Sequence, residues 1–178
     1  MFPQLFKNIV SINGFATNPI KGMFGLDITN SAFKLIKQGY GLLPETLSYL
    51  WKVVADNPLA MTASALAGGF NINLTSVKDI EIYGRGVAGV ELDVFLELFE
   101  QMTGYDGTPV LDRISVPTLL ISGTSDTVTP KHYQDAMHRA IKTSELVTVP
   151  YGSHCTQLDM PDYVNLRAEK FYKQHNYT

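Results

Sequence analysis

Three short apolar runs lie near the two ends of the chain and predict strands. The first covers residues 7–16, with apolar side chains at positions 9, 10, 12 and 15. The second, Thr118–Ser122, is almost continuously apolar, which is typical of a strand buried on both faces of a parallel sheet. The third, Glu145–Val149, is ended by Pro150. We therefore expect three strands, of which the last two are close in sequence.

Helical periodicity follows each of the last two strands. Within 131–142, one apolar helix face is formed by Tyr133, Ala136, Met137 and Ala140. Pro161 suits the first turn of a final helix. The apolar face of that helix comprises Val164, Ala168, Phe171 and Tyr172. The order strand, helix, strand, helix over 118–174 predicts an α/β fold with a parallel sheet.

The middle of the chain, 17–112, has the pattern of helices. Pro44 opens a helix whose apolar face comprises Leu47, Leu50, Trp51 and Val54. A second helix near 91–103 has a face of the same spacing, formed by Leu92, Phe95, Leu96 and Phe99. One segment, Asp79–Tyr83, is compatible with a short strand. We expect 17–112 to be a mainly helical insertion between two strands of the sheet.

A glycine motif within this insertion has two interpretations. Residues 84–89, GRGVAG, match the Gly-x-Gly-x-x-Gly pattern of dinucleotide-binding turns, and Asp112 lies about 20 residues downstream, where such a site has an acidic residue. However, Asp79 and Glu81 precede the motif where a buried parallel strand requires apolar residues. We therefore favour a flexible loop whose glycines permit movement, with dinucleotide binding as the alternative.

Composition and charge exclude several classes of protein. With 178 residues, 45% hydrophobic and 17% charged, the chain has the composition of one soluble globular domain. A net charge of −3 and the lack of a Lys/Arg run argue against nucleic-acid and anionic-lipid partners. No apolar run approaches the roughly 20 residues of a membrane span, and the N-terminus lacks a signal-peptide pattern. The single cysteine, Cys155, fits a reducing, cytoplasmic setting.

An acid and a histidine occupy the turns that follow the last two strands. Asp126 ends the turn Gly-Thr-Ser-Asp after the second strand, and His154 ends the turn Tyr-Gly-Ser-His after the third. Ligands of open parallel sheets bind at the carboxyl ends of the strands, so we expect both side chains at one edge. An aspartate that accepts the Nδ1 proton of the histidine would leave Nε2 as a general base.

The stretch Ile114–Phe171 resembles the C-terminal third of α/β-hydrolase-fold enzymes. The shared pattern is an apolar strand, a Gly-x-x-Asp turn with a proline after it, a helix, a second strand, a Gly-Ser-His turn and a closing helix. The order of acid before histidine also fits. The resemblance implies that Asp126 is the triad acid and His154 the triad base of a serine hydrolase. It implies a carboxylic ester or related acyl substrate, and neither a cofactor nor a metal.

The same resemblance, more weakly, extends upstream. The stretch FPQLFKNIVSINGFATNP, residues 2–19, resembles the family's sixth strand, and 17–112 then correspond to its helical cap over the active site. The α/β core would comprise 1–16 and 113–178, with the last three strands of the family's sheet. The cap is rich in large apolar residues, some of which we expect to line an acyl pocket: Phe24, Leu26, Phe33, Leu42, Leu43, Trp51, Met61, Phe70 and Phe95.

The nucleophile of the family is missing from the pattern. It lies on a Gly-x-Ser-x-Gly elbow, and no serine here has glycine at both flanking positions; Ser125, for instance, is followed by Thr127 at the second one. We expect the nucleophile and the oxyanion hole to lie upstream of Met1, so that this chain alone is an inactive fragment. Residues 7–16 would then form an open sheet edge that can self-associate or pair with another chain.

Other interpretations remain open at this point. Within the fold, an aspartate nucleophile would give epoxide or haloalkane hydrolysis, and acyl transfer is another alternative. A non-catalytic remnant that binds a partner or an apolar ligand is the alternative outside enzymology. We interpret His132 and His138 as residues of a solvated helix face, and Cys155 as a small filler. The carboxylates of one helix face are interpreted as solvent-facing rather than as a glycosidase pair: Asp93, Glu97 and Glu100.

Overall fold

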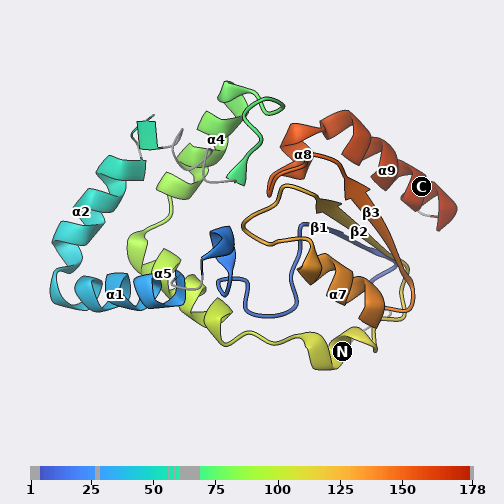
Figure 1. Cartoon of the computed structure of the whole chain (residues 1–178), viewed down its shortest axis with the longest axis horizontal. Coiled ribbons are helices and arrows are strands. Elements are labelled where there is room, and N and C mark those ends of the chain that lie inside the picture. Colours follow the sequence, from blue (N-terminus) through green and yellow to red (C-terminus); the bar gives the residue numbers. More distant parts are fainter. Residues whose placement is uncertain (1–4, 27–28, 56, 58, 61–68, 177–178) are drawn as a thin grey trace.

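A parallel sheet forms one half of the molecule. The structure is a computed structural model that describes residues 5–26, 29–55, 57, 59–60 and 69–176. Within them, β1 (Ile9–Ile12), β2 (Thr118–Gly123) and β3 (Ser144–Val149) form a sheet in the order β1-β2-β3 (Figure 1). Both pairings are parallel, with Ile9 opposite Thr118 and Thr118 opposite Ser144. The predicted α/β class and parallel sheet are confirmed.

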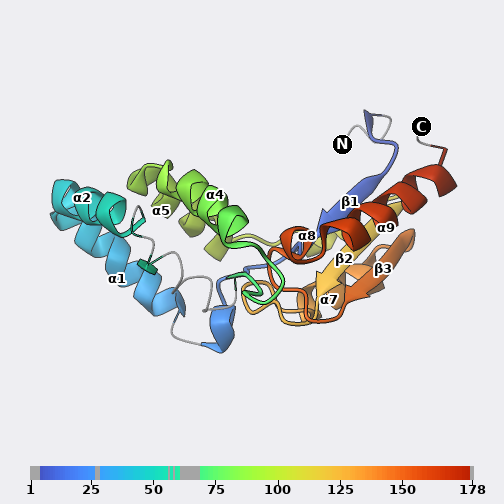
Figure 2. The same cartoon turned by 90° about the horizontal axis from the view of Figure 1, so that it is seen from above.

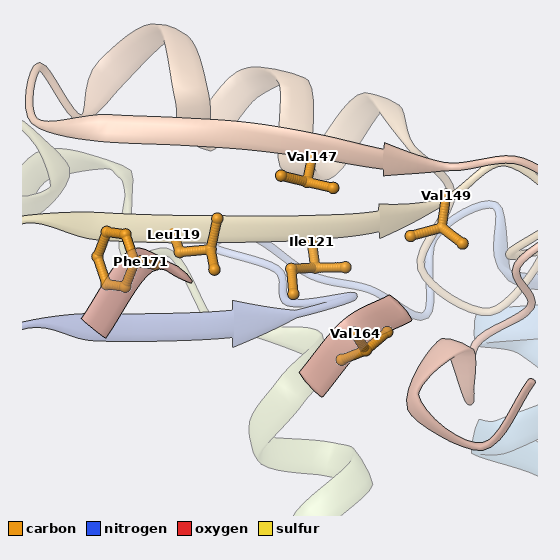
Figure 3. Close-up of a cluster of buried hydrophobic side chains, with 6 residues drawn as sticks. All are labelled: Leu119, Ile121, Val147, Val149, Val164 and Phe171. Carbon is orange, nitrogen blue, oxygen red and sulfur yellow. The ribbon is translucent and has the colours of Figure 1, made fainter. Parts of the chain in front are cut away.

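The central strand β2 is buried along its whole length and organises two apolar layers. Leu119 and Ile121 point to one face, where they pack with Val147, Val149, Val164 and Phe171 (Figure 3). The last two residues belong to α9 (Pro161–Gln174). Leu120 points to the other face and packs with residues that include Met137 of α7 (His132–Ala140). Helices therefore cover both faces of the sheet, as a continuously apolar parallel strand requires.

The two predicted helices of this half are confirmed, with one change in the face of α7. Ala136, which we expected on the apolar face, is exposed, whereas Gln134 is buried. The amide of Gln134 contacts the Ser122 hydroxyl and donates to the carbonyl of Gly14 at 2.6 Å. A glutamine can replace an apolar residue in this layer because its polar atoms are hydrogen-bonded.

The first strand is shorter than we expected. β1 ends at Ile12, and the prediction of a strand up to Ala16 is wrong. Asn13 adopts a left-handed conformation with φ of 49°, and its main-chain amide still donates to Ile121 O at 2.8 Å. The sequence Asn13-Gly14 is a turn signal that ends the strand before the apolar pattern does. Among the described residues, β1 pairs with β2 alone, so its other edge is open.

Helices form the other half of the molecule (Figures 1 and 2). They follow a short 3-10 turn at Met23–Gly25 and comprise α1 (Thr29–Leu42), α2 (Pro44–Ala55), α4 (Val77–Ala88) and α5 (Leu92–Thr103). The short α6 (Thr108–Leu111) lies in the sheet half, where it contacts α7 and its Leu111 packs in the same core as Leu120. A last short helix, α8 (Thr156–Asp159), precedes α9 in the sheet half. The prediction of a mainly helical segment is confirmed, although α1, which contains Gly39 and Gly41, was not predicted.

A small apolar core joins α1, α2 and α5. Phe33, Leu92 and Leu96 are buried there, and Leu47, Trp51 and Phe99 pack against them. The indole of Trp51 also donates to Val90 O at 3.0 Å, which joins α2 to the turn before α5. The predicted apolar face of α5 is confirmed. That of α2 is only partly right, because Leu50 and Val54 are about half exposed, at 47% and 53%.

The segment around the glycine motif is helical throughout. The interpretation of Asp79–Tyr83 as a strand is wrong, and so is that of 84–89 as a flexible loop, because residues 77–88 form α4. The helix begins at Ser76, whose side chain accepts the amide of Asp79 at 3.2 Å. Gly89 caps its end, with its amide bonded to Arg85 O and Val87 O. These amides are used within the helix, so the motif does not form a phosphate-binding turn.

No helix among the described residues is long and apolar enough to cross a membrane.

Two glycines provide a matched test of this fold. A Cβ at Gly86, inside α4, would meet no atom within 4 Å, so Gly86→Ala should raise the free energy of unfolding by about 0.5–1 kcal/mol. A Cβ at Gly123 would lie 2.6 Å from the carbonyl carbon of Gly152, so Gly123→Ala should lower it by about 1–3 kcal/mol. Urea unfolding measures both. A loss of stability in Gly86→Ala would contradict the helix.

Candidate active site

The carboxylate of Asp126 is held by its own turn at the end of β2. Its Oδ1 accepts the amides of Val128 and Thr129, each at 2.8 Å. Its Oδ2 accepts the hydroxyl of Thr129 at 2.8 Å. The side chain is fully buried. A short acidic side chain bonding to amides two and three residues onward is a common turn geometry, and here it fixes the direction of the carboxylate.

The imidazole of His154 contacts this carboxylate. Its Nδ1 lies 3.1 Å from Oδ2 of Asp126 and 3.1 Å from the Thr129 hydroxyl. An ionised carboxylate can only accept, so this contact requires the proton on Nδ1. Within the described part of the chain, Nε2 has no hydrogen-bond partner, and 29% of the side chain is exposed. The two residues that the sequence singled out are therefore brought together as expected.

The two turns that carry these residues are bonded to each other. The amide of Ser125 donates to Gly152 O at 2.8 Å, and the amide of Tyr151 donates to the Thr124 hydroxyl at 2.8 Å. Close approach at Gly152 is allowed because neither it nor Gly123 has a Cβ. The carboxyl ends of β2 and β3 thus form one rigid edge.

A buried carboxylate joins the histidine turn to the helical half. Asp159, which is 5% exposed, accepts the amide of Ser153 at 2.5 Å and that of Asn71 at 3.1 Å. The Thr75 hydroxyl donates to the same carboxylate. The residue before His154 is thereby connected to the segment that leads into α4. Asp159 and Thr129 were not predicted from the sequence, since a single Asp or Thr in a turn has no distinctive pattern.

An apolar cavity of about 480 Å³ borders His154. Its walls come from both halves of the molecule and include Phe15, Met23, Phe24, Trp51, Phe70, Tyr83, Phe95, Phe99, Val128 and Cys155. Four of the apolar residues expected to form a pocket are in this lining, namely Phe24, Trp51, Phe70 and Phe95. Four are not, namely Leu26, Phe33, Leu42 and Leu43, and Met61 lies outside the described residues.

One wall of this cavity is formed by residues of α4 that we did not predict as pocket residues. Ile80, Tyr83, Gly84 and Val87 of α4 all line it. Their spacing is i, i+3, i+4, i+7, which is the signal of one helix face. Burial raises the pKa of Tyr83, whose ring packs edge-on against Phe70 at 5.1 Å between centroids. The signal was present, and the interpretation of 79–83 as a strand obscured it.

Cys155 and the other candidate groups do not form a second site. Burial, reinforced by the charges of Asp159 and Asp126, raises the pKa of the Cys155 thiol to about 12. Cys155 is 2% exposed, which agrees with a filler role. His132 and His138 are exposed, as expected. The carboxylates of α5 are also exposed, and Lys37 forms ion pairs with two of them, Glu97 and Glu100. The described residues contain no group of metal-ligating side chains.

Sequence comparisons match the same end of the chain. A hydrolase-family model described as TAP-like protein matches residues 102–171. The serine hydrolase BPHL of Homo sapiens is 34% identical over 62 residues, which are 35% of this chain and 21% of BPHL. A pimeloyl-[acyl-carrier protein] methyl ester esterase of Neisseria meningitidis is 39% identical over 49 residues, which are 28% of this chain and 19% of the esterase. The matches thus span about a fifth of each curated relative.

Structural comparisons cover nearly the whole chain. A hydrolase from Pseudomonas aeruginosa PA01 has a TM-score of 0.68 and 20% identity, over 95% of this chain and 56% of that one. A bromoperoxidase from Bacillus anthracis has a TM-score of 0.64 and 21% identity, over 94% of this chain and 58% of that one. An α/β-hydrolase enzyme from a deep-sea metagenome library has a TM-score of 0.61 and 19% identity, over 97% and 58%. These neighbours show that the chain has the α/β-hydrolase fold, and residues 102–171 match the family model.

Proposed function

We propose that this chain supplies the acid and the base of a Ser-His-Asp triad in a hydrolase of carboxylic esters or related acyl compounds. The observation that carries the proposal is the 3.1 Å contact between Nδ1 of His154 and Oδ2 of Asp126. The curated relatives, a serine hydrolase and a methyl ester esterase, support this class of reaction. Resemblance of fold alone would not do so, because one fold hosts many chemistries.

Each residue has a defined role in the proposed reaction. A serine hydroxyl, supplied by a segment outside these 178 residues, attacks the ester carbonyl. Nε2 of His154 takes the hydroxyl proton and later gives it to the leaving alcohol. Asp126 holds the imidazole in the tautomer with the proton on Nδ1 and stabilises the imidazolium that forms. The hydrogen bonds that occupy the Asp126 carboxylate keep it aimed at His154.

The cavity indicates the acyl part of the substrate. Its volume of about 480 Å³ lies within the usual range of roughly 300–1,000 Å³ for small-molecule pockets, and its walls are mostly apolar. A small apolar acyl group fits this chemistry. In this proposal 17–112 are the cap of the active site, and 1–16 with 113–178 are the core. Support comes from the cavity walls, because Trp51, Tyr83 and Phe95 of the helical half face the same space as His154.

The open edge of β1 is the proposed place for a further strand. β1 pairs only with β2 among the described residues, and Val10 and Ile12 are only partly buried at the margin of the core. An apolar edge of this kind favours pairing with another strand. We propose that the strand preceding the nucleophile binds there in the active protein. In its absence a second copy of the chain can pair at the same edge.

A binding module for apolar ligands is the second candidate function. It is favoured by the cavity, whose described lining residues include no serine. A fluorophosphonate probe distinguishes the two, because it labels only an activated serine. We expect no labelling of the 178-residue chain. We expect labelling of a polypeptide that also contains the elbow, reduced at least about 1,000-fold by His154→Ala. Failure of the longer polypeptide to be labelled would favour the binding module.

The tautomer of His154 can be tested in the present chain. Replacing Asp126 with asparagine presents an amide to Nδ1, which favours the proton on Nε2. The ¹⁵N shifts of the imidazole should therefore indicate an Nδ1 proton in the wild type and an Nε2 proton in Asp126→Asn. Asp135→Asn on α7, which removes an ion pair with Lys131 just before that helix, is the control and should leave the shifts unchanged. An Nε2 proton in the wild-type protein would contradict the proposed pair.

The thiol beside His154 should be inert in the folded protein. With the pKa of Cys155 raised from 9.0 to about 12, the thiolate is scarce at pH 8, so iodoacetamide should react far more slowly with the native chain than with the unfolded one. The thiol of the unfolded chain loses its proton at a lower pH than the thiol of the folded chain. The contribution of Cys155 to the free energy of unfolding should therefore decrease as the pH rises from about 9 to 12. Mass spectrometry of timed reactions measures the labelling. Rapid labelling of native protein would instead support a thiol nucleophile.

A further inference from the structure

Asn13 lies at the carboxyl end of β1, and its side chain contacts the histidine turn. The residue is 3% exposed. Its Nδ2 donates to the carbonyl oxygens of Ser153 at 2.8 Å and His154 at 2.7 Å, and contacts the Thr156 hydroxyl at 3.0 Å. One side-chain amide therefore holds the two carbonyl groups on either side of the Cα of His154. The carbonyl of His154 is among these acceptors, so the contact is to the proposed base itself.

The same residue contacts the acid turn from its other atoms. Oδ1 of Asn13 accepts the amide of Gly123, the last residue of β2, at 2.8 Å. The main-chain carbonyl oxygen of Asn13 lies 2.8 Å from the hydroxyl oxygen of Thr129. That hydroxyl also contacts Asp126 and His154. Asn13 thus connects the ends of β1 and β2 to the turn after β3.

We propose that Asn13 is a positioning residue that sets the place of His154 relative to Asp126. This inference rests on the proposed function, in which His154 is the base. Asn13 touches neither the substrate nor the reacting atoms in this scheme. It acts through the main chain of residues 153–154, from which the imidazole extends toward Asp126. The distance of 3.1 Å between Nδ1 and Oδ2 is near the long end for such a bond, so a small shift of the turn would break it.

Few other side chains could replace this one. Both ends of the amide are used, with donors facing Ser153 and His154 and the acceptor facing Gly123. An aspartate has no donor when ionised and would face two carbonyl oxygens with a negative charge. The φ of 49° is also tolerated by asparagine and glycine better than by other residues. Asparagine satisfies both the hydrogen-bonding requirement and the backbone conformation at position 13.

The test separates the side chain from the backbone. Asn13→Gly removes the side chain and retains a residue that accepts positive φ, whereas Asn13→Asp keeps the shape and loses the donors. Asn18→Asp is the matched control. Nδ2 of Asn18 donates to Thr103 O at 2.9 Å, and its Oδ1 accepts the main-chain amide of Ile20 at 2.9 Å. Its side chain is thus also bonded at both ends, but it does not contact the histidine turn.

The readout is the Nδ1 proton of His154 in ¹⁵N-histidine-labelled protein. In Asn13→Gly the buried carbonyl oxygens of Ser153 and His154 lose their donor, so the histidine turn should open more often. We therefore expect the Nδ1 proton to exchange with water about tenfold faster than in the wild type. In Asn13→Asp the signal should be lost. In Asn18→Asp it should be unchanged. Each variant is compared at equal distance below its own melting temperature, so that general loss of stability does not contribute. If Asn13→Asp does not fold, Asn13→Gly alone is decisive.

Three results would overturn the proposal. A folded Asn13→Gly with wild-type exchange would show that the side chain does not position His154. Equal acceleration in Asn18→Asp would show that general loosening is the cause. Absence of the Nδ1 proton in the wild type would remove the Asp126–His154 pair, and with it both the proposed function and this role of Asn13. The first two results leave the proposed function intact, so the two failures can be distinguished.

Discussion

Burial of β2 between two strands and two layers of helix is the constraint on which the sheet half depends. Leu119 and Ile121 can be removed from water only if α9 covers one face, and Leu120 only if α7 covers the other. Of these two helices, α7 is also the connection that brings the chain from β2 back to β3 in the same direction, whereas α9 follows β3. Parallel pairing then places the ends of β1, β2 and β3 at a single edge. The residues that follow these strands meet there, although they are far apart in sequence.

The chemistry of the site is a consequence of this meeting. Asp126 follows β2 and His154 follows β3, while Asn13 follows β1 and contacts the turns of both. Backbone amides and the Thr129 hydroxyl satisfy the carboxylate of Asp126, so that it can remain buried beside the imidazole. The helical half contributes the apolar side of the cavity, and Asp159 bonds it to the histidine turn. A polar edge beside an apolar space is the arrangement that the proposed acyl chemistry requires.

The sequence predicted those features that depend on regular periods. The strand Thr118–Ser122 and the helix from Pro161 have one unbroken pattern each, and both were correct. The meeting of Asp126 with His154 followed from the geometry of parallel strands. By contrast, Asp79 to Tyr83 alternates like a strand within a helix, and the cap at Ser76 was the signal that could have decided between them. The contacts of Asn13 join residues more than 100 positions apart, and no local pattern contains that information.

The proposed triad is best tested by reading the coding DNA upstream of the Met1 codon in all three frames. We expect strand-like segments followed by a Gly-x-Ser-x-Gly elbow, and ester hydrolysis by the joined polypeptide that is lost in His154→Ala. An aspartate at the centre of the elbow would change the reaction to epoxide or haloalkane hydrolysis. Three frames without any such elbow would contradict the claim that Asp126 and His154 serve a nucleophile encoded beside them.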